Sequence, residues 1–158
     1  MTIESFAVIG GDVRFAYLAG ALAADGFSVI SAGLENTAIP PCVTGCTSAV
    51  QAISSADAII LPMPVSNDGV TLGAPFAHKQ ILLEGVLSAL RPSQLVFGGA
   101  LSEAVLQQAN AHGIVLHDYL SREEMALRNA VPTAEGAVQL AMEELPVTIA
   151  GAQCLVTG

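Results

Sequence analysis

The residues best suited to binding an anion follow the first apolar run of the chain. Asp12 and Arg14 come directly after Phe6-Ala7-Val8-Ile9-Gly10-Gly11. This run predicts a strand buried on both faces that ends in a tight glycine turn. An arginine beside such a turn can bind a carboxylate through two parallel hydrogen bonds. The residues alone leave open the alternative that Arg14 is an ordinary surface charge on the first turn of a helix.

A second candidate site is the stretch from Arg128 to Gly136, which reads Arg-Asn-Ala-Val-Pro-Thr-Ala-Glu-Gly. Pro132 predicts the first position of a helix. The free N–H groups and the hydroxyl of Thr133, with the amide of Asn129 beside them, would then bind a carboxylate. Glu135 would transfer a proton, orient its neighbours or complement the positive helix end. A well-formed helix start without a ligand explains the same residues.

Composition narrows the class of protein. The chain has 158 residues, of which 53% are hydrophobic, so we expect one folded domain with a real core. The net charge is −9 and only five residues are basic, so we expect no nucleic-acid partner.

We see no signal peptide and no apolar run long enough for a membrane span, and we expect a cytoplasmic protein. Cys42 and Cys46 have no His or acidic cluster nearby, so no metal site is expected.

Apolar runs alternate with amphipathic stretches, which is typical of an α/β protein. We expect a flavodoxin-like or Rossmann-like three-layer domain with a five-stranded parallel sheet in the order 2-1-3-4-5. The predicted strands are Phe6–Ile9, Phe27–Ile30, Asp57–Leu61, Leu95–Phe97 and Ile114–Leu116. The predicted helices are Arg14–Asp25, Ser48–Ser55, Ala77–Leu90, Ser102–His112, Ser121–Arg128 and Thr133–Leu145. A loop is expected over Ala32–Cys46, a hairpin or tight loop around Asn67-Asp68-Gly69, and further extended pieces at Val147–Ile149 and from Gln153 onward.

In such a sheet the ligand crevice lies at the carboxyl ends of the strands. Four sets of residues are expected there: Asp12 with Arg14, Pro62–Ser66, Gly98–Ala100, and Asp118 with Tyr119. The Gly10-Gly11 turn does not have the dinucleotide fingerprint, because Asp12 and Phe15 stand where its second and third glycines would be.

Three short motifs carry a resemblance to a known family. They are Val8-Ile9-Gly10-Gly11-Asp12 followed by Arg14, Ile59-Ile60-Leu61-Pro62, and Asn129 followed by Pro132-Thr133-Ala134-Glu135-Gly136. In this order they resemble the A subunit of bacterial dipicolinate synthase, over nearly the whole chain. The resemblance implies a flavodoxin-like substrate-side domain over residues 1–150. It also implies the start of an NAD(P)-binding Rossmann domain at residues 151–158, in a layout similar to the D-2-hydroxyacid dehydrogenases.

The resemblance also implies a function. The protein would take part in converting a cyclic dicarboxylate from lysine biosynthesis to dipicolinate, by loss of water and oxidation of the ring, in the mother cell of a sporulating bacterium. The B subunit of dipicolinate synthase would be a partner, and we expect a homo-oligomer. NAD(P) would bind the full-length chain, with Gly158 as a cofactor contact, whereas these 158 residues alone are expected to be inactive and to bind it weakly. The alternative is a non-catalytic flavodoxin-like domain that binds a small ligand or regulator.

The expected site joins the two candidate stretches. Asp12, Arg14, Asn129 and Thr133 would bind the substrate, and Glu135 would be the catalytic residue. The shortage of basic residues departs from what a dianion site needs. The stretch Ala32–Thr47 also has no motif that matches the family.

Overall fold

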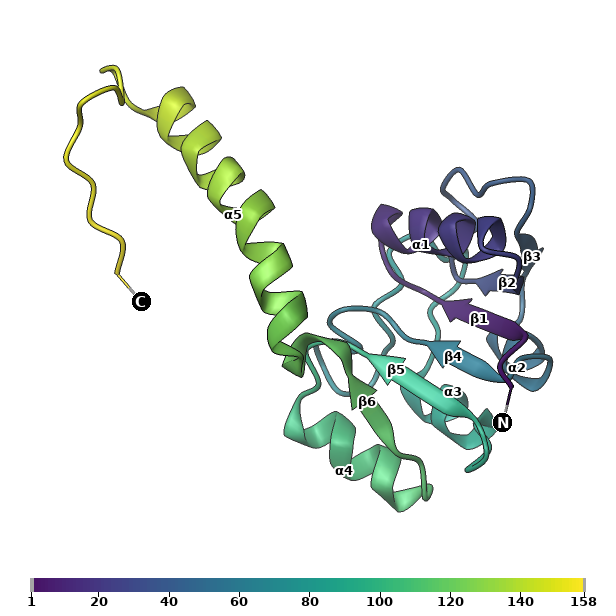
Figure 1. The fold of residues 1–158 in the computed structure, drawn as a ribbon. Helices are drawn as coiled ribbons and strands as arrows, with labels where there is room; N and C mark the ends of the chain where they lie inside the picture. The colour runs from purple at the N-terminus through teal and green to yellow at the C-terminus, as the bar shows by residue number, and fades with distance from the viewer. Residues whose placement is uncertain (1, 158) are drawn as a thin grey trace. The chain divides into compact units, whose positions relative to one another are not determined.

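The computed structural model describes residues 2–157, which fall into two units with the boundary between Tyr119 and Leu120. The first unit is a three-layer α/β domain around a parallel six-stranded sheet of order β3-β2-β1-β4-β5-β6 (Figure 1). Its strands are β1 (Ser5–Ile9), β2 (Ser28–Ala32), β3 (Thr44–Cys46), β4 (Ala58–Ile60), β5 (Leu95–Gly98) and β6 (Leu116–Asp118). The expected α/β class and parallel sheet are confirmed.

The prediction of five strands in the order 2-1-3-4-5 is wrong, because a sixth strand lies at one edge of the sheet. This strand, β3, pairs with β2 in the register Ile30↔Thr44 and lies inside the stretch expected to be a loop. Its sequence is Thr-Gly-Cys, which has no apolar run for a periodicity argument to detect. The pairing with β2 therefore defines this strand, and its own side chains do not.

The two faces of the sheet are covered by different helices. The helices of the first unit are α1 (Val13–Ala24), α2 (Ala49–Ser54), α3 (Leu83–Ala89) and α4 (Glu103–Ala111). Helices α2, α3 and α4 pack in one hydrophobic cluster and α1 packs in another. Along β1, Ala7 and Ile9 belong to the first cluster and Val8 to the second, as the two-residue period of a strand requires.

Helix α3 is shorter than predicted. The sequence predicts a helix over Ala77–Leu90, but the structure has a loop up to Leu82. The end of this loop pairs with another segment, since the N–H of Leu72 donates to the carbonyl of Ile81 at 2.9 Å and Thr71 pairs with Leu82 in an antiparallel bridge. Tertiary hydrogen bonds therefore override the helical pattern at its amino end.

The second unit is dominated by one helix, α5 (Glu123–Glu144), where two helices were predicted. The error comes from Pro132, which lies inside α5 and does not start a helix. A proline inside a helix removes the N–H that would bond the carbonyl four residues earlier, so a break was the reasonable expectation. No residue of α5 is buried within the chain.

Two predicted extended pieces are not strands in the described part of the second unit. Val147–Ile149 and residues 152–157 have no regular secondary structure, and Gly158 lies outside the described residues. None of the helices in residues 2–157 is long and apolar enough to cross a membrane.

The buried side chain of Gln94 forms hydrogen bonds between the segment before β5 and the end of α2. Its Nε2 group donates to the carbonyls of Ile53 and Ala56, both at 2.8 Å, and its Oε1 accepts from the N–H of Arg91 at 2.8 Å. The side chain is only 6% exposed. These three bonds satisfy backbone groups between the end of α2 and the start of β5.

Replacing Gln94 with Ala should remove three buried hydrogen bonds, those to the carbonyls of Ile53 and Ala56 and the one from the N–H of Arg91. We expect Gln94→Ala to lower the free energy of unfolding by about 2–4 kcal/mol in urea denaturation. Gln107→Ala is the matched control, because Gln107 donates only to Glu103 on the exposed side of α4. Equal stability of the two variants would contradict this role of Gln94.

Candidate functional site

A cavity of about 530 Å³ lies at the carboxyl ends of β1 and β4. The strand connections diverge on either side of this pair, since β1 also pairs with β2 and β4 with β5. In open α/β sheets such a switch point is where ligands bind. Residues around the cavity include Gly11, Asp12, Met63, Pro64, Asn67 and Thr71. The structure therefore brings together two of the predicted sets, the first turn and the Pro62–Ser66 segment.

The N–H groups of the glycine turn after β1 are engaged by nearby backbone carbonyls. Gly10 and Gly11 have φ values of 69° and 96°, and their N–H groups donate to the carbonyls of Ala32 (2.7 Å) and Gly73 (2.8 Å). A Cβ on Gly11 would lie 2.3 Å from the ring of Phe15. The N–H groups that cradle a pyrophosphate in nucleotide-binding folds are thus already bonded here, so this turn does not fit a dinucleotide.

Asp12 lines this cavity, and its carboxylate binds Arg14 on the first turn of α1. Asp12 is the N-cap of α1, and its Oδ1 accepts from the N–H of Arg14 at 3.0 Å. The Nε and Nη2 groups of Arg14 donate to the same carboxylate at 3.0 and 2.7 Å. The side-chain hydrogen bonds from Arg14 lower the pKa of Asp12, and the same bonds raise the pKa of Arg14. A ligand carboxylate would therefore bind Arg14 through the remaining Nη1–Nη2 edge.

The loop opposite this pair is organised by Asp68. Its carboxylate accepts from the N–H groups of Val70 (2.8 Å) and Thr71 (2.7 Å) and from the hydroxyls of Thr71 (2.8 Å) and Ser66 (3.0 Å). The backbone bonds from Thr71 and Val70 hold the pKa of Asp68 far below its ordinary value. The expected tight loop is therefore an Asp-centred turn that fixes Thr71 beside the cavity.

The ends of β5 and β6 carry the other two predicted sets. The ring of Tyr119 packs against Gly99, where a Cβ would lie 2.6 Å from the ring. Burial raises the pKa of Tyr119 to about 12, so its phenol stays neutral and able to donate a hydrogen bond. Ala100 has a φ of 52°, a left-handed conformation that is uncommon for a residue with a side chain. Such backbone positions cluster at functional sites.

The remaining predicted site residues lie on α5, in the second unit. The expected helix start with free N–H groups at Thr133 is wrong, because Thr133 lies in the helix interior and its hydroxyl donates to the carbonyl of Asn129 at 2.7 Å. Asn129, Thr133 and Glu135 belong to a different unit from Asp12 and Arg14, so the joint site of these five residues stays a prediction.

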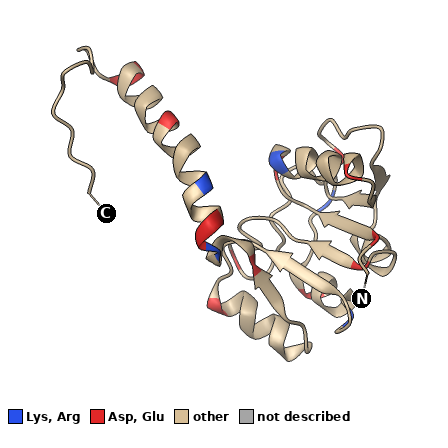
Figure 2. Ribbon diagram, viewed as in Figure 1, with Lys and Arg blue, Asp and Glu red and all other residues tan. Residues whose placement is uncertain are grey.

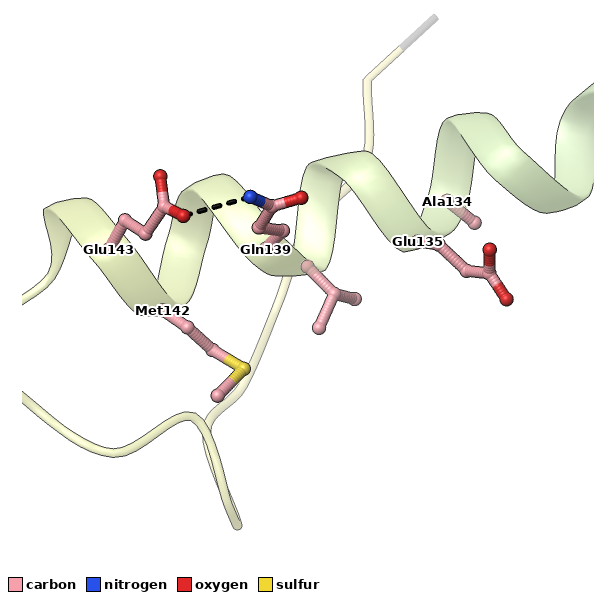
Figure 3. Close-up of a pocket in the computed structure, with 6 residues that line it drawn as sticks. Ala134, Glu135, Gln139, Met142 and Glu143 are labelled. Carbon is pink, nitrogen blue, oxygen red and sulfur yellow. Dashed lines mark hydrogen bonds between the residues drawn. The ribbon is translucent and has the colours of Figure 1, made fainter.

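Glu135 borders a hollow of about 680 Å³ on the second unit (Figure 3). All six lining residues belong to α5, namely Ala134, Glu135, Val138, Gln139, Met142 and Glu143. Gln139 donates to Glu143 at 2.8 Å, and Figure 3 shows the carboxylate of Glu135 apart from that pair. A ligand here would contact one wall only, so the hollow by itself is a helix surface and not a catalytic centre.

Basic groups are scarce throughout the structure (Figure 2). Arg14, Arg122 and Arg128 pair with acids, and Arg91 donates to the backbone carbonyls of Ser54 and Ala56. The guanidinium of Arg91 is therefore engaged by the backbone. No group of three or more His, Cys, Asp or Glu side chains within residues 2–157 could hold a metal ion.

Sequence reasoning missed one feature of the carboxyl edge. A second cavity, of about 560 Å³, lies beyond the ends of β2 and β3 and is lined by residues that include Glu35, His78 and Lys79. His78 falls within the helix predicted over Ala77–Leu90, but it lies in the loop before α3. The available signal was Glu35, an acidic residue three positions after the end of β2.

The Asp12–Arg14 pair leads to a stability prediction. Asp12→Ala removes the N-cap of α1 and should lower the free energy of unfolding by about 1 kcal/mol at neutral pH. Arg14→Ala removes only a largely exposed ion pair and should cost about 0–0.5 kcal/mol. Because folding lowers the pKa of Asp12, its contribution is present above the ordinary value of 3.8 and is lost as the pH falls through the folded-state pKa.

Urea denaturation of both variants at neutral and at acidic pH measures these effects. The difference between the wild-type chain and Asp12→Ala should shrink below pH 3.8. An equal loss for both variants at neutral pH would mean that the ion pair, and not the cap, stabilises the start of α1.

Comparison with known proteins identifies relatives of this chain by sequence and by fold. The family model for the N-terminal domain of the dipicolinate synthase A subunit matches residues 5–120. The corresponding full-length A subunit of Bacillus subtilis (strain 168) is 26% identical over 165 residues, which cover 100% of this chain and 54% of that protein.

Two crystal structures share the fold. The A chain of dipicolinate synthase from Bacillus subtilis has a TM-score of 0.77 at 23% identity, covering 94% of this chain and 51% of that one. The dipicolinate synthase A subunit from Bacillus halodurans has a TM-score of 0.79 at 22% identity, and the match covers 92% of this chain and 50% of that one. The chain thus spans about half the length of these relatives. Since the family model covers the sheet and the ends of its strands, the chain belongs to the family of N-terminal domains of the dipicolinate synthase A subunit.

Proposed function

We propose that this chain is the substrate-side part of a dipicolinate synthase A subunit. The observation that carries the proposal is the cavity at the β1–β4 switch point, in a domain that belongs to this family. Asp12 and the Met63-Pro64 segment border the cavity from two neighbouring strands. Such a place suits a small substrate that must be held by groups from several elements.

The proposed substrate is a cyclic dicarboxylate of lysine biosynthesis, which would lose water and be oxidised to dipicolinate. One carboxylate would bind the Nη1–Nη2 edge of Arg14, whose other edge Asp12 holds in place. Asn129 and Thr133 are proposed to bind the substrate and Glu135 to transfer a proton. Their roles no longer depend on free N–H groups at a helix start, since all three lie inside α5.

The proposed electron acceptor is NAD(P). The turn after β1 has its N–H groups bonded within the first unit, so the nucleotide would bind elsewhere in the full-length protein. Gly158, the expected cofactor contact, lies outside the described residues. The B subunit as a partner, a homo-oligomer and a role in the cytoplasm of a sporulating mother cell belong to the same proposal.

Dipicolinate formation by the full-length protein together with its B subunit tests the proposal. Arg14→Ala should lower kcat/KM roughly ten- to a hundredfold, because it removes a charge-assisted contact to the substrate. Thr133→Val should also lower it, with the fold intact by circular dichroism. No dipicolinate from the wild-type pair, with dipicolinate still binding in calorimetry, would favour the non-catalytic alternative.

Arg91→Ala is the control for this experiment. Arg91 also carries one positive charge, but it precedes β5 and therefore lies at the amino ends of the strands. Its loss should affect stability, through the bonds to Ser54 and Ala56, and leave kcat/KM of the folded protein nearly unchanged. Equal kinetic losses in Arg14→Ala and Arg91→Ala would contradict the proposed crevice.

A further inference from the structure

The second cavity at the carboxyl edge has a different chemical character from the first. Thr47 lies directly after β3, while Val50 belongs to α2 and Val86 to α3. Lys79 and Gln80 reach the cavity from the loop before α3. Groups from several separate elements therefore converge on a space of about 560 Å³, which is within the usual range for small-molecule sites.

Glu35 gives this cavity a fixed negative charge. Its Oε1 accepts from the N–H of Gly33 at 2.8 Å and its Oε2 from the N–H of His78 at 3.1 Å. Burial alone would raise the pKa of Glu35, but the backbone bonds from Gly33 and His78 outweigh it and hold the pKa below its usual value. Each carboxylate oxygen has two lone-pair directions, so both can still accept a bond from a ligand.

The loop that carries Lys79 is anchored to the same turn. The bond from His78 to Glu35 is supported by a second one, from the N–H of Asn36 to the carbonyl of Phe76 at 2.9 Å. These bonds connect residues about forty positions apart in the chain. The loop that carries Lys79 is therefore fixed in position beside the turn that carries Glu35.

Lys79 supplies the opposite charge and is the one lysine of the sequence. It forms no ion pair with any residue that the structure describes, although Glu35 lines the same cavity. The other described cations of the first unit are engaged, Arg14 by Asp12 and Arg91 by backbone carbonyls. Two opposite charges thus border one cavity without neutralising each other.

Apolar side chains complete the lining. Val50 is 54% exposed and Leu82 is 56% exposed, and both line this cavity, so their aliphatic surface is open to a bound molecule. Val86, from α3, adds a buried aliphatic surface beside them. A bound molecule would therefore bury an apolar part here while its charged ends meet the two walls.

We propose that this cavity binds a small zwitterion, an α-amino acid with an aliphatic side chain. Its ammonium group would donate to Glu35, its carboxylate would bind Lys79, and its side chain would cover Val50 and Leu82. The site is separate from the proposed dicarboxylate crevice, although Gln80 and Ile81 line both cavities. The proposal does not depend on the proposed function, since it concerns other residues and a different charge pattern.

A matched set of three probes tests the charge pattern. Titration of the ¹⁵N-labelled chain with L-leucine should give saturable amide shifts at Glu35, Thr47 and Lys79 in NMR spectra. The same titration with 4-methylpentanoate, which lacks the ammonium group, or 3-methylbutylamine, which lacks the carboxylate, should give much weaker binding. No saturable shifts with L-leucine, or equal binding of either single-charge analogue, would overturn the proposal.

Variants at Lys79 test the site itself. Lys79→Gln should weaken binding of L-leucine roughly tenfold or more, and Lys79→Arg should retain most of it. Both changes are at an exposed residue, so the fold should be preserved. Arg122→Gln is the control, because it removes the same charge from the second unit. If Lys79→Gln binds as tightly as the wild-type chain, Lys79 is not a receptor and the proposed site is wrong.

Discussion

The rest of the structure depends on the parallel pairing of β1 with two neighbours at once. Ala7, Val8 and Ile9 are completely buried, and β1 pairs with β2 along one edge and β4 along the other. A strand buried on both faces must be covered by helices on each side, which fixes three layers. Its carboxyl end must also lie at the switch point of the sheet. The positions of the glycine turn, the cap of α1 and the first cavity all follow from this one strand.

How far the sequence predicts the fold depends on how much of each element is encoded locally. Strand β1 and helix α4 are predictable because an apolar run defines the first and the N-cap Ser102 begins the second, with its hydroxyl accepting from Val105 at 3.3 Å. Strand β3 is not predictable, since its pairing with β2 is a tertiary property. Pro132 carries a strong local signal that the structure does not follow. Its preference for a helix start is outweighed by the helical residues on both sides of it.

The candidate site follows the same rule. Asp12 and Arg14 lie just beyond the carboxyl end of β1, as predicted, because the sequence defines that strand well, and their binding of a substrate stays a prediction. Their mutual ion pair could not be foreseen, because the sequence is compatible with Arg14 pointing either toward Asp12 or toward a ligand. The Glu35 cavity was missed because it needs contacts between residues more than forty positions apart, such as the bond from His78 to Glu35. Local patterns locate the ends of strands, but they do not show which loops cover them.

The scarcity of free cations has a consequence for how anionic ligands reach this protein. With a net charge of −9 and Arg14 neutralised by Asp12, the long-range field around the first cavity is not attractive to a dianion. If the proposed dianion binds there, repulsion would slow its encounter with the cavity and added salt would accelerate it, opposite to the behaviour of sites that steer their substrates. Recognition of the proposed substrate would then rely on short-range bonds formed after contact, and selectivity between anions would be expressed mainly in how slowly they dissociate.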